Sequence, residues 1–338
     1  MHLLLNGIFI AILAHGLIGA SLVWDKILLG QPATRSLANY VFWMGSLSIL
    51  ALLLIPFGFH RPPAGPATLA FVAGVVELAA TWFYYAALQS GEASETLAVT
   101  GGFAPLATAL IAIPLLAKPL GGHSVPAFGL MVAGGFAMFA SEKLQWRRVL
   151  PSVLLAAILF GLANVLQKLV FNATGFVTGY VFFTLGTFCG AMALLLRPLW
   201  RRQIFEQSAE APPKSKLWYF VNRFVSGVGS FLIFFAISRA NPAVVTAISG
   251  VRYTVVFLGA YLITKVKPEW LHEDFHRRAL IGKSIATALV VTGLVLIGLE
   301  GTGTAAAAHP AGCLHGKART LHAAGATLMP EFIASFWR

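Results

Sequence analysis

Two stretches of this sequence decide the fold: AALQSGEASETLAVTGGFAPLATALIAIPLL at 86–116 and AISRANPAVVTAISGVRYTVVFLGAYLI at 236–263. They match at a constant offset of 149 residues, which pairs Gly101 with Gly250. Other pairs at this offset are Phe71-Val72 with Phe220-Val221, Ala98 with Ala247, and Lys118-Pro119 with Lys267-Pro268. A constant offset in a fixed order indicates an internal repeat.

Outside these stretches the repeat continues in both directions. Matched pieces in the same order are Tyr40-Val41-Phe42 with Tyr180-Val181-Phe182, LLLIP (52–56) with LLLRP (194–198), and Gly135…Glu142 with Gly293…Glu300. We therefore divide the chain into a first repeat, 1–148, and a second repeat, 149–300. The remainder, 301–338, is rich in Ala, Gly and His without helical periodicity, and we expect it to be a disordered tail.

The composition is that of a membrane protein. Of 338 residues, 58% are hydrophobic and 11% are charged, and the mean hydropathy is +0.79. Soluble domains carry about 25% charged residues, so lipid must be the solvent here. Apolar runs near the length of one bilayer crossing fall at 3–24, 37–57, 67–89, 95–117, 124–141, 149–170, 176–197, 216–238, 243–264 and 279–299. The sequence predicts an all-α integral membrane protein of ten transmembrane helices.

The ten predicted spans form two halves of five, and an odd number of spans places the second half upside down in the membrane. Such inverted repeats are typical of secondary transporters, because exchange of the two shapes gives alternating access. The internal connection 198–215 is basic and contains prolines, and we expect a flexible loop there. The net charge of +12 lies mostly in connections between spans, so we expect no nucleic-acid partner.

With this pattern, residues 1–300 resemble the ten-helix, EamA-like members of the drug/metabolite transporter superfamily. The resemblance is carried by 86–116, with its proline at Pro105, and by 236–263, with its Arg-x-x-Val-x-Phe piece at Arg252–Phe257. Such families place a glutamate after the fourth and ninth helices, whereas this chain has LLAKPL and ITKVKP there. The resemblance implies a divergent carrier of small metabolites or amphipathic compounds, with a cavity between the halves.

Two charged residues fall deep inside predicted spans. Glu77 and Arg252 each lie about ten residues into their helices, hence ~15 Å deep and near the midplane. Ionisable residues at this depth normally face the protein interior or a water-filled cavity. They either line a substrate path, with Glu77 carrying a coupling proton, or form a structural ion pair. Glu77 is the one acidic residue that the predicted spans place at depth.

Polar residues at helical spacing extend from both charges. We predict a substrate site that comprises Glu77, Thr81, Tyr84, Tyr85, Ser249, Arg252, Tyr253, His15 and Asn164. His15, in the middle of the first span, is either a substrate contact or a buried histidine bonded to backbone. Lys168 lies near a helix end, where such a side chain reaches toward water. Arg223, a turn or two into its helix, either does the same or faces the cavity.

The leading hypothesis is a multi-pass transporter of the cell (inner) membrane that exports a small organic solute, with a proton as candidate coupling ion. A carrier of nucleotide-linked or lipid-linked sugars is the alternative, and a membrane-embedded enzyme or a non-transporting sensor belongs to another class. No catalytic or metal motif is present, so we expect neither an enzyme nor a cofactor. We expect a monomer or a homodimer. Most loop Lys and Arg follow odd-numbered spans, which places both termini outside, whereas the resemblance implies the opposite.

Overall fold

The computed structural model describes residues 7–29, 36–90, 93–116, 124–141, 146–210, 212–267 and scattered residues between 269 and 296. The elements are α1 (Gly7–Leu29), α2 (Leu37–Ser46), η3 (Leu47–Phe57), α3 (Ala64–Ser90), α4 (Ala93–Leu116), α5 (Ser124–Ser141), α6 (Trp146–Thr174), α7 (Phe176–Ala193), η4 (Leu194–Leu196), α8 (Pro198–Glu210), α9 (Pro213–Arg239), α10 (Pro242–Ala247) and α11 (Gly250–Val266). The described part is entirely helical. The predicted tail, 301–338, lies outside it.

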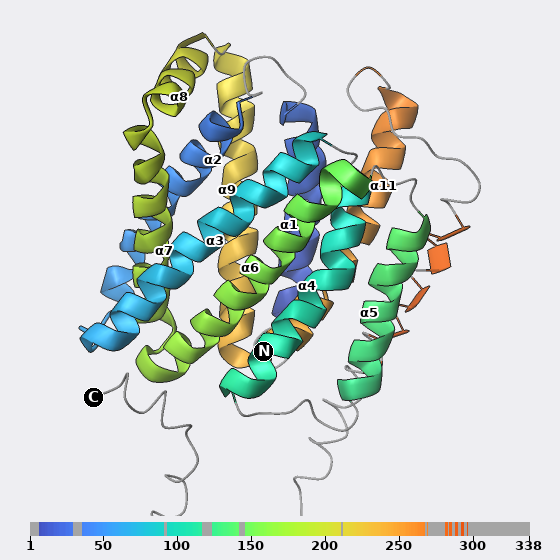
Figure 1. Ribbon diagram of the computed structural model, residues 1–338, viewed down its shortest axis with the longest axis horizontal. Coiled ribbons are helices and arrows are strands. Elements are labelled where there is room, and N and C mark those ends of the chain that lie inside the picture. The colour runs from blue at the N-terminus through green and yellow to red at the C-terminus, as the bar shows by residue number, and fades with distance from the viewer. Residues whose placement is uncertain are drawn as a thin grey trace, which may run out of the picture.

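The long helices run side by side as a bundle (Figure 1). Seven stretches are long and apolar enough to cross a membrane, which confirms a multi-pass, all-α membrane protein. Helices α4 and α5, at the predicted spans 95–117 and 124–141, contain shorter apolar pieces, Thr100–Leu116 and Val125–Ala137. The last predicted span, 279–299, is described only at scattered residues.

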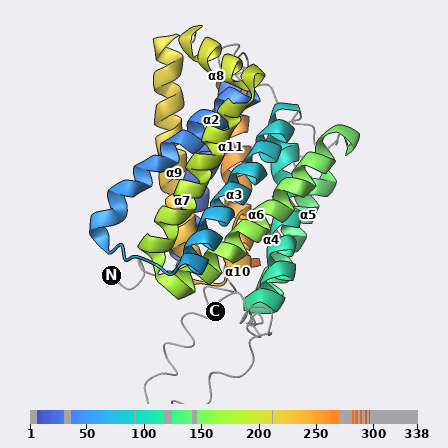
Figure 2. The same ribbon diagram turned by 60° about the vertical axis from the view of Figure 1, so that its left-hand side comes forward.

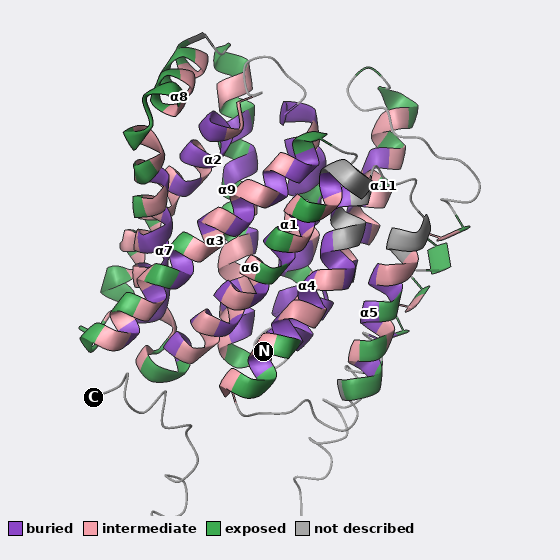
Figure 3. Ribbon diagram, in the orientation of Figure 1, coloured by how far each residue is buried: buried purple, intermediate pink, exposed green. Residues whose placement is uncertain are grey.

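Two crossings hold the bundle together. Helix α1 packs along α9 and α11, and α6 packs along α3 and α4. Figure 3 shows α1 largely buried, and its buried residues include His15 and Asp25. Leucine and phenylalanine side chains are exposed on the outer surface, for example Leu110 and Phe224, as expected where the neighbour is lipid. The polar residues of α1 therefore face protein.

The structure corrects one predicted connection and adds detail to one predicted span. The connection 198–215 is not a flexible loop, because Pro198–Glu210 forms α8, which packs against α2 at one end of the bundle (Figure 2). Its Ile204 is fully buried, so an apolar contact holds this helix in place. The predicted span 243–264 lies within one stretch long enough to cross a membrane, Pro242–Val266, in which a turn at Ile248 and Ser249 separates α10 from α11. The backbone stays hydrogen-bonded through this turn, where Ser249 N donates to the Thr246 carbonyl and Val251 N to the Ile248 carbonyl, both at 3.0 Å.

Helices α3 and α7 meet at glycines. A Cβ atom on Gly74 would collide with the carbonyl oxygen of Phe183 and lie 2.8 Å from the Thr187 nitrogen. A Cβ atom on Gly186 would collide with the carbonyl oxygen of Phe71. Thr187 donates a 3.1 Å hydrogen bond from its hydroxyl to the Gly74 carbonyl. Small residues thus allow the two backbones to touch, as is usual between membrane helices.

We predict that Gly74→Ala destabilises the bundle by about 1–3 kcal/mol, since the added methyl group must push α3 away from α7. The measurement is the melting temperature of the purified protein in detergent. Gly227→Ala is the matched control, because nothing lies within 4 Å of a Cβ atom built there. Equal melting temperatures for the two variants would contradict this account of the contact.

Candidate functional site

The two predicted midplane charges do not pair. Among the described residues, the ion pairs within 4.0 Å are Arg202 with Glu206 and Arg223 with Asp25. Glu77 on α3 keeps a buried carboxylate oxygen, Oε2, that has no hydrogen-bond partner in the described part of the chain. Arg252 on α11 likewise has a buried, unpartnered Nε. The alternative of a structural Glu77–Arg252 ion pair is therefore not what the structure contains.

His15 bridges the turn between α10 and α11. Its Nε2 lies 2.9 Å from the carbonyl oxygen of Val245 on α10, and its Nδ1 lies 3.1 Å from the Arg252 guanidinium on α11. A carbonyl can only accept, so Nε2 carries the hydrogen, and Nδ1 accepts from Arg252. Of the two interpretations of this histidine, the backbone-bonded one is present, and the imidazole also orients Arg252.

Most of the other predicted site residues lie on the helices that surround this bridge. Ser249 Oγ and Tyr253 Oη are 3.1 Å apart, and a Cβ atom on Gly101 would collide with the Tyr253 ring. The Asn164 amide lies 3.5 Å from the Thr246 hydroxyl. Thr81 is buried. Glycine at 101 thus lets α4 approach α11 at the level of Tyr253.

The tyrosine pair of α3 divides between two environments. The rings of Tyr84 and Tyr85 lie 5.6 Å apart, edge to face. The Tyr84 hydroxyl is buried and has no hydrogen-bond partner among the described residues, while the Tyr85 hydroxyl donates to Asp25 at 2.7 Å. Tyr84 therefore belongs with the unpartnered groups near the midplane, and Tyr85 belongs to a second polar cluster.

That second cluster surrounds Asp25, which the sequence analysis missed. The predicted first span ended at residue 24, but α1 continues to Leu29, and the Asp25 carboxylate is fully buried. It accepts hydrogen bonds from Tyr40 Oη at 2.6 Å and Tyr85 Oη at 2.7 Å, and from Asn222 Nδ2 and Arg223 Nη2. Four donors from α2, α3 and α9 converge on one carboxylate. In the sequence, the sign of this buried cluster was the polar pair Asn222-Arg223 inside a predicted span.

Aromatic rings enclose the arginine of this cluster. The Arg223 guanidinium carbon lies 5.2 Å from the ring centroid of Tyr40 and 5.6 Å from that of Tyr219, within the range of cation–π attraction. Tyr219 donates its hydroxyl to the Tyr40 carbonyl at 2.8 Å. Arg223 is therefore held inside the protein and does not reach water from its helix.

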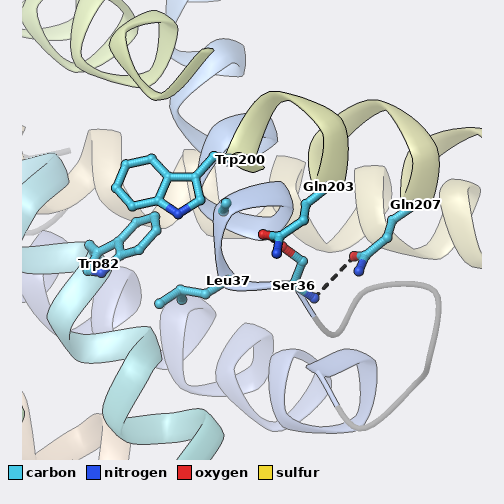
Figure 4. A pocket seen from close by; sticks show the side chains of 7 residues that line it. Ser36, Leu37, Trp82, Trp200, Gln203 and Gln207 are labelled. Atoms are coloured by element: carbon cyan, nitrogen blue, oxygen red, sulfur yellow. Dashed lines mark hydrogen bonds between the residues drawn. The ribbon is translucent and has the colours of Figure 1, made fainter. Parts of the chain in front are cut away.

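A separate surface cavity of about 470 Å³ lies beneath α8 (Figure 4). Its lining residues are Ser36, Leu37, Ala38, Trp82, Trp200, Gln203 and Gln207. The Trp82 and Trp200 rings lie 4.9 Å apart, and the Ser36 backbone donates to Gln207 at 3.1 Å. None of the predicted site residues lines this cavity. In the described part of the chain, no three His, Cys, Asp or Glu residues are grouped as a metal site would require.

Comparison with known proteins supports the fold. No protein-family model and no curated protein matches this sequence. A chain of known crystal structure superposes with a TM-score of 0.59 at 17% sequence identity, over 89% of this chain and 98% of the other. At that identity the likeness shows a shared fold alone.

The two buried carboxyls predict opposite mutational effects. Asp25→Asn should lower the melting temperature on the order of 10 °C, because it leaves a buried guanidinium without its counter-charge. Glu77→Gln should leave the melting temperature within about 2 °C or raise it, because Glu77 makes no ion pair within 4.0 Å in the described part of the chain. Both are measured on purified protein in one detergent. A larger loss for Glu77→Gln than for Asp25→Asn would contradict this assignment of the two environments.

Proposed function

We propose that this protein is a secondary transporter that exports a small organic solute by alternating access. In this proposal it is a ten-helix, EamA-like member of the drug/metabolite transporter superfamily in the cell (inner) membrane. The proposal is supported by matched contacts between the two halves and by the unpartnered polar groups between them.

The first matched contact involves a lysine in each half. Lys26 on α1 donates to the Leu88 carbonyl near the end of α3, at 2.8 Å. Lys168 on α6 donates to the Ser238 carbonyl near the end of α9, at 3.0 Å. Lys26 and Lys168 are 142 residues apart, and Leu88 pairs with a neighbour of Ser238 at the offset of 149. The same contact thus recurs at corresponding places in the two repeats.

The second matched contact crosses from one half to the other. A Cβ atom on Gly19 of α1 would lie 3.0 Å from the Arg252 carbonyl oxygen on α11. A Cβ atom on Gly161 of α6, which is 142 residues later, would lie 2.9 Å from the Thr108 nitrogen on α4. The first helix of each half therefore crosses the fourth span of the other half at a glycine. These two equivalent crossings, α1 on α11 and α6 on α4, are the observation that carries the proposal. Inverted repeats that make equivalent contacts with each other can exchange their conformations.

Groups that could bind a solute lie where the halves meet. Glu77 comes from the first half and Arg252 from the second, and each keeps a buried polar atom without a partner among the described residues. Buried polar groups are normally satisfied, so such atoms mark a place where a ligand or water belongs. The turn between α10 and α11 lies beside these groups, since His15 bonds to the Val245 carbonyl on one side of it and to Arg252 on the other.

Glu77 is the candidate for proton coupling in this proposal. An unpaired carboxylate at membrane depth is costly, and protonation removes that cost when the carrier reorients. Arg252, which His15 holds at 3.1 Å, remains available to a polar group of the solute.

The test is transport by purified protein in liposomes. A thermal-shift screen of amino acids, monosaccharides and amphipathic cations first selects compounds that raise the melting temperature. Their counterflow is then measured by mass spectrometry with and without a pH gradient. The proposal expects at least one compound to move against empty-liposome controls. If no selected compound moves, the chain is not a carrier of these solutes.

We predict that Glu77→Gln abolishes the acceleration of transport by a pH gradient, because an amide cannot carry a proton, and lowers gradient-driven flux about tenfold or more. Thr254→Ala is the matched control, since the hydrogen bond of the Thr254 hydroxyl within the described part of the chain stays inside its own helix, to the Gly250 carbonyl at 3.4 Å. Unchanged gradient-driven flux in Glu77→Gln would eliminate the proton role of this residue.

A further inference from the structure

The two ends of the bundle are chemically different where the proposed repeats correspond. At the offset of 142, Asp25 corresponds to Gln167, and at the offset of 149, Arg223 corresponds to Gly74. Asp25 and Arg223 meet at the end of the bundle where α1 ends. Gln167 on α6 is fully buried, and neither its Oε1 nor its Nε2 has a partner among the described residues.

The end at Gln167 is closed by apolar contacts and contains no ion pair in the described part of the chain; its Lys168 bonds to the Ser238 carbonyl within the second half. The Phe234 ring lies 4.6 Å from that of Phe183 and 6.0 Å from that of Tyr180. Gly74 brings the backbone of α3 against that of α7. Separation of these surfaces exposes apolar rings and an amide, and separates no charges.

The end at Asp25 is closed by an ion pair and three further donors. Opening here must separate Arg223 from Asp25 and withdraw the hydroxyl groups of Tyr40 and Tyr85. Removal of one member of such a buried pair is strongly destabilising, because the other charge remains out of water. The two ends therefore differ in what must be broken to open them.

We propose that Asp25 and Arg223 form a charge gate, which holds this end of the transport path closed and biases the carrier toward opening at the Gln167 end. The inference rests on the proposed function and deepens it, because it assigns the residues that set which side the site faces. Asp25 and Arg223 are positioning residues in this scheme. They act on the helix arrangement, and Glu77 and Arg252 face the solute.

The orphaned amide of Gln167 agrees with this scheme. A group at the position equivalent to Asp25, buried without partners, has lost the converging donors that Asp25 retains. Its counterpart to Tyr85 at the offset of 149 is Phe234, which has no hydroxyl to offer. Among the residues that the structure describes, the complete set of gate contacts thus lies at the Asp25 end.

The experiment measures both ends of the same molecule by double electron–electron resonance. Spin labels at Ser90→Cys and Leu217→Cys report the Asp25 end, and labels at Thr68→Cys and Arg239→Cys report the Gln167 end. The four positions are exposed and correspond pairwise at the offset of 149. The background is Cys189→Ser with Cys313→Ser, which removes both native cysteines.

Tyr85→Phe is the principal variant, because it keeps the ring and removes two hydrogen bonds of the cluster: the one that Tyr85 donates to Asp25, at 2.7 Å, and the one that it accepts from Arg223 Nη1, at 3.1 Å. Loss of these hydrogen bonds to charged groups should raise the open-to-closed ratio at the Asp25 end about tenfold. The distance between the labels at the Gln167 end should shorten in the same population. Asp25→Asn should shift the ratio further. If Asp25→Asn does not yield folded protein, Tyr85→Phe alone decides the test.

Tyr219→Phe is the matched control, because its hydroxyl belongs to the same cluster but donates to the Tyr40 carbonyl and not to Asp25. Its distance distributions should equal those of the parent. The gate is refuted if Tyr85→Phe leaves both distributions unchanged, or if Tyr219→Phe shifts them equally. If the protein transports a screened compound but the spin-label distances in Tyr85→Phe are unchanged, the gate is overturned and the proposed transport function stands. Shifted distances without transport of any screened compound would support the gate and overturn the carrier.

Discussion

Charge that is taken out of water needs partners, and this requirement fixes one end of the bundle. The Asp25 carboxylate is fully buried, and its hydrogen-bond donors come from three other helices, α2, α3 and α9. Only a narrow range of helix positions brings all of them to one carboxylate. Next to it, the Lys26 ammonium reaches the end of α3. The packing of α1 against α9, which is central to the fold, is therefore tied to electrostatic satisfaction as well as to apolar contact.

The middle of the bundle follows the opposite rule. Glu77 and Arg252 lie in different halves, do not pair, and keep unpartnered atoms. A structure optimised for stability alone would satisfy or remove these groups. The Arg252 guanidinium is nevertheless oriented, since His15 connects it across the turn between α10 and α11 to Val245. The Arg252 guanidinium is thus held in place without an acidic partner within 4.0 Å in the described part of the chain, so its charge remains available to a ligand.

Local patterns predicted the helices well and long-range polar contacts poorly. Apolar runs located the spans, because the bilayer imposes both length and composition. The prolines and charges of 198–215 predict a loop, whereas the structure has α8 there. The apolar residues that anchor α8 to the bundle, such as Ile204, are too few to form a clear sequence pattern. Equal depth suggested that Glu77 and Arg252 meet, but depth does not fix the direction in which a side chain points. The Asp25–Arg223 contact joins residues 198 positions apart, and no local periodicity encodes it.

The proposed internal repeat relates these polar clusters to each other, which no single motif does. In the proposed carrier, two identical ends would open equally often, because the two conformations, each open at one end, would have the same free energy. A preferred facing therefore requires positions at which the repeats have diverged. Asp25 against Gln167 and Arg223 against Gly74 are such positions, and they place a buried ion pair at one end and glycine packing at the other. In the proposed carrier, matched packing between the halves permits exchange of shapes, and differences in a few buried charges bias its direction.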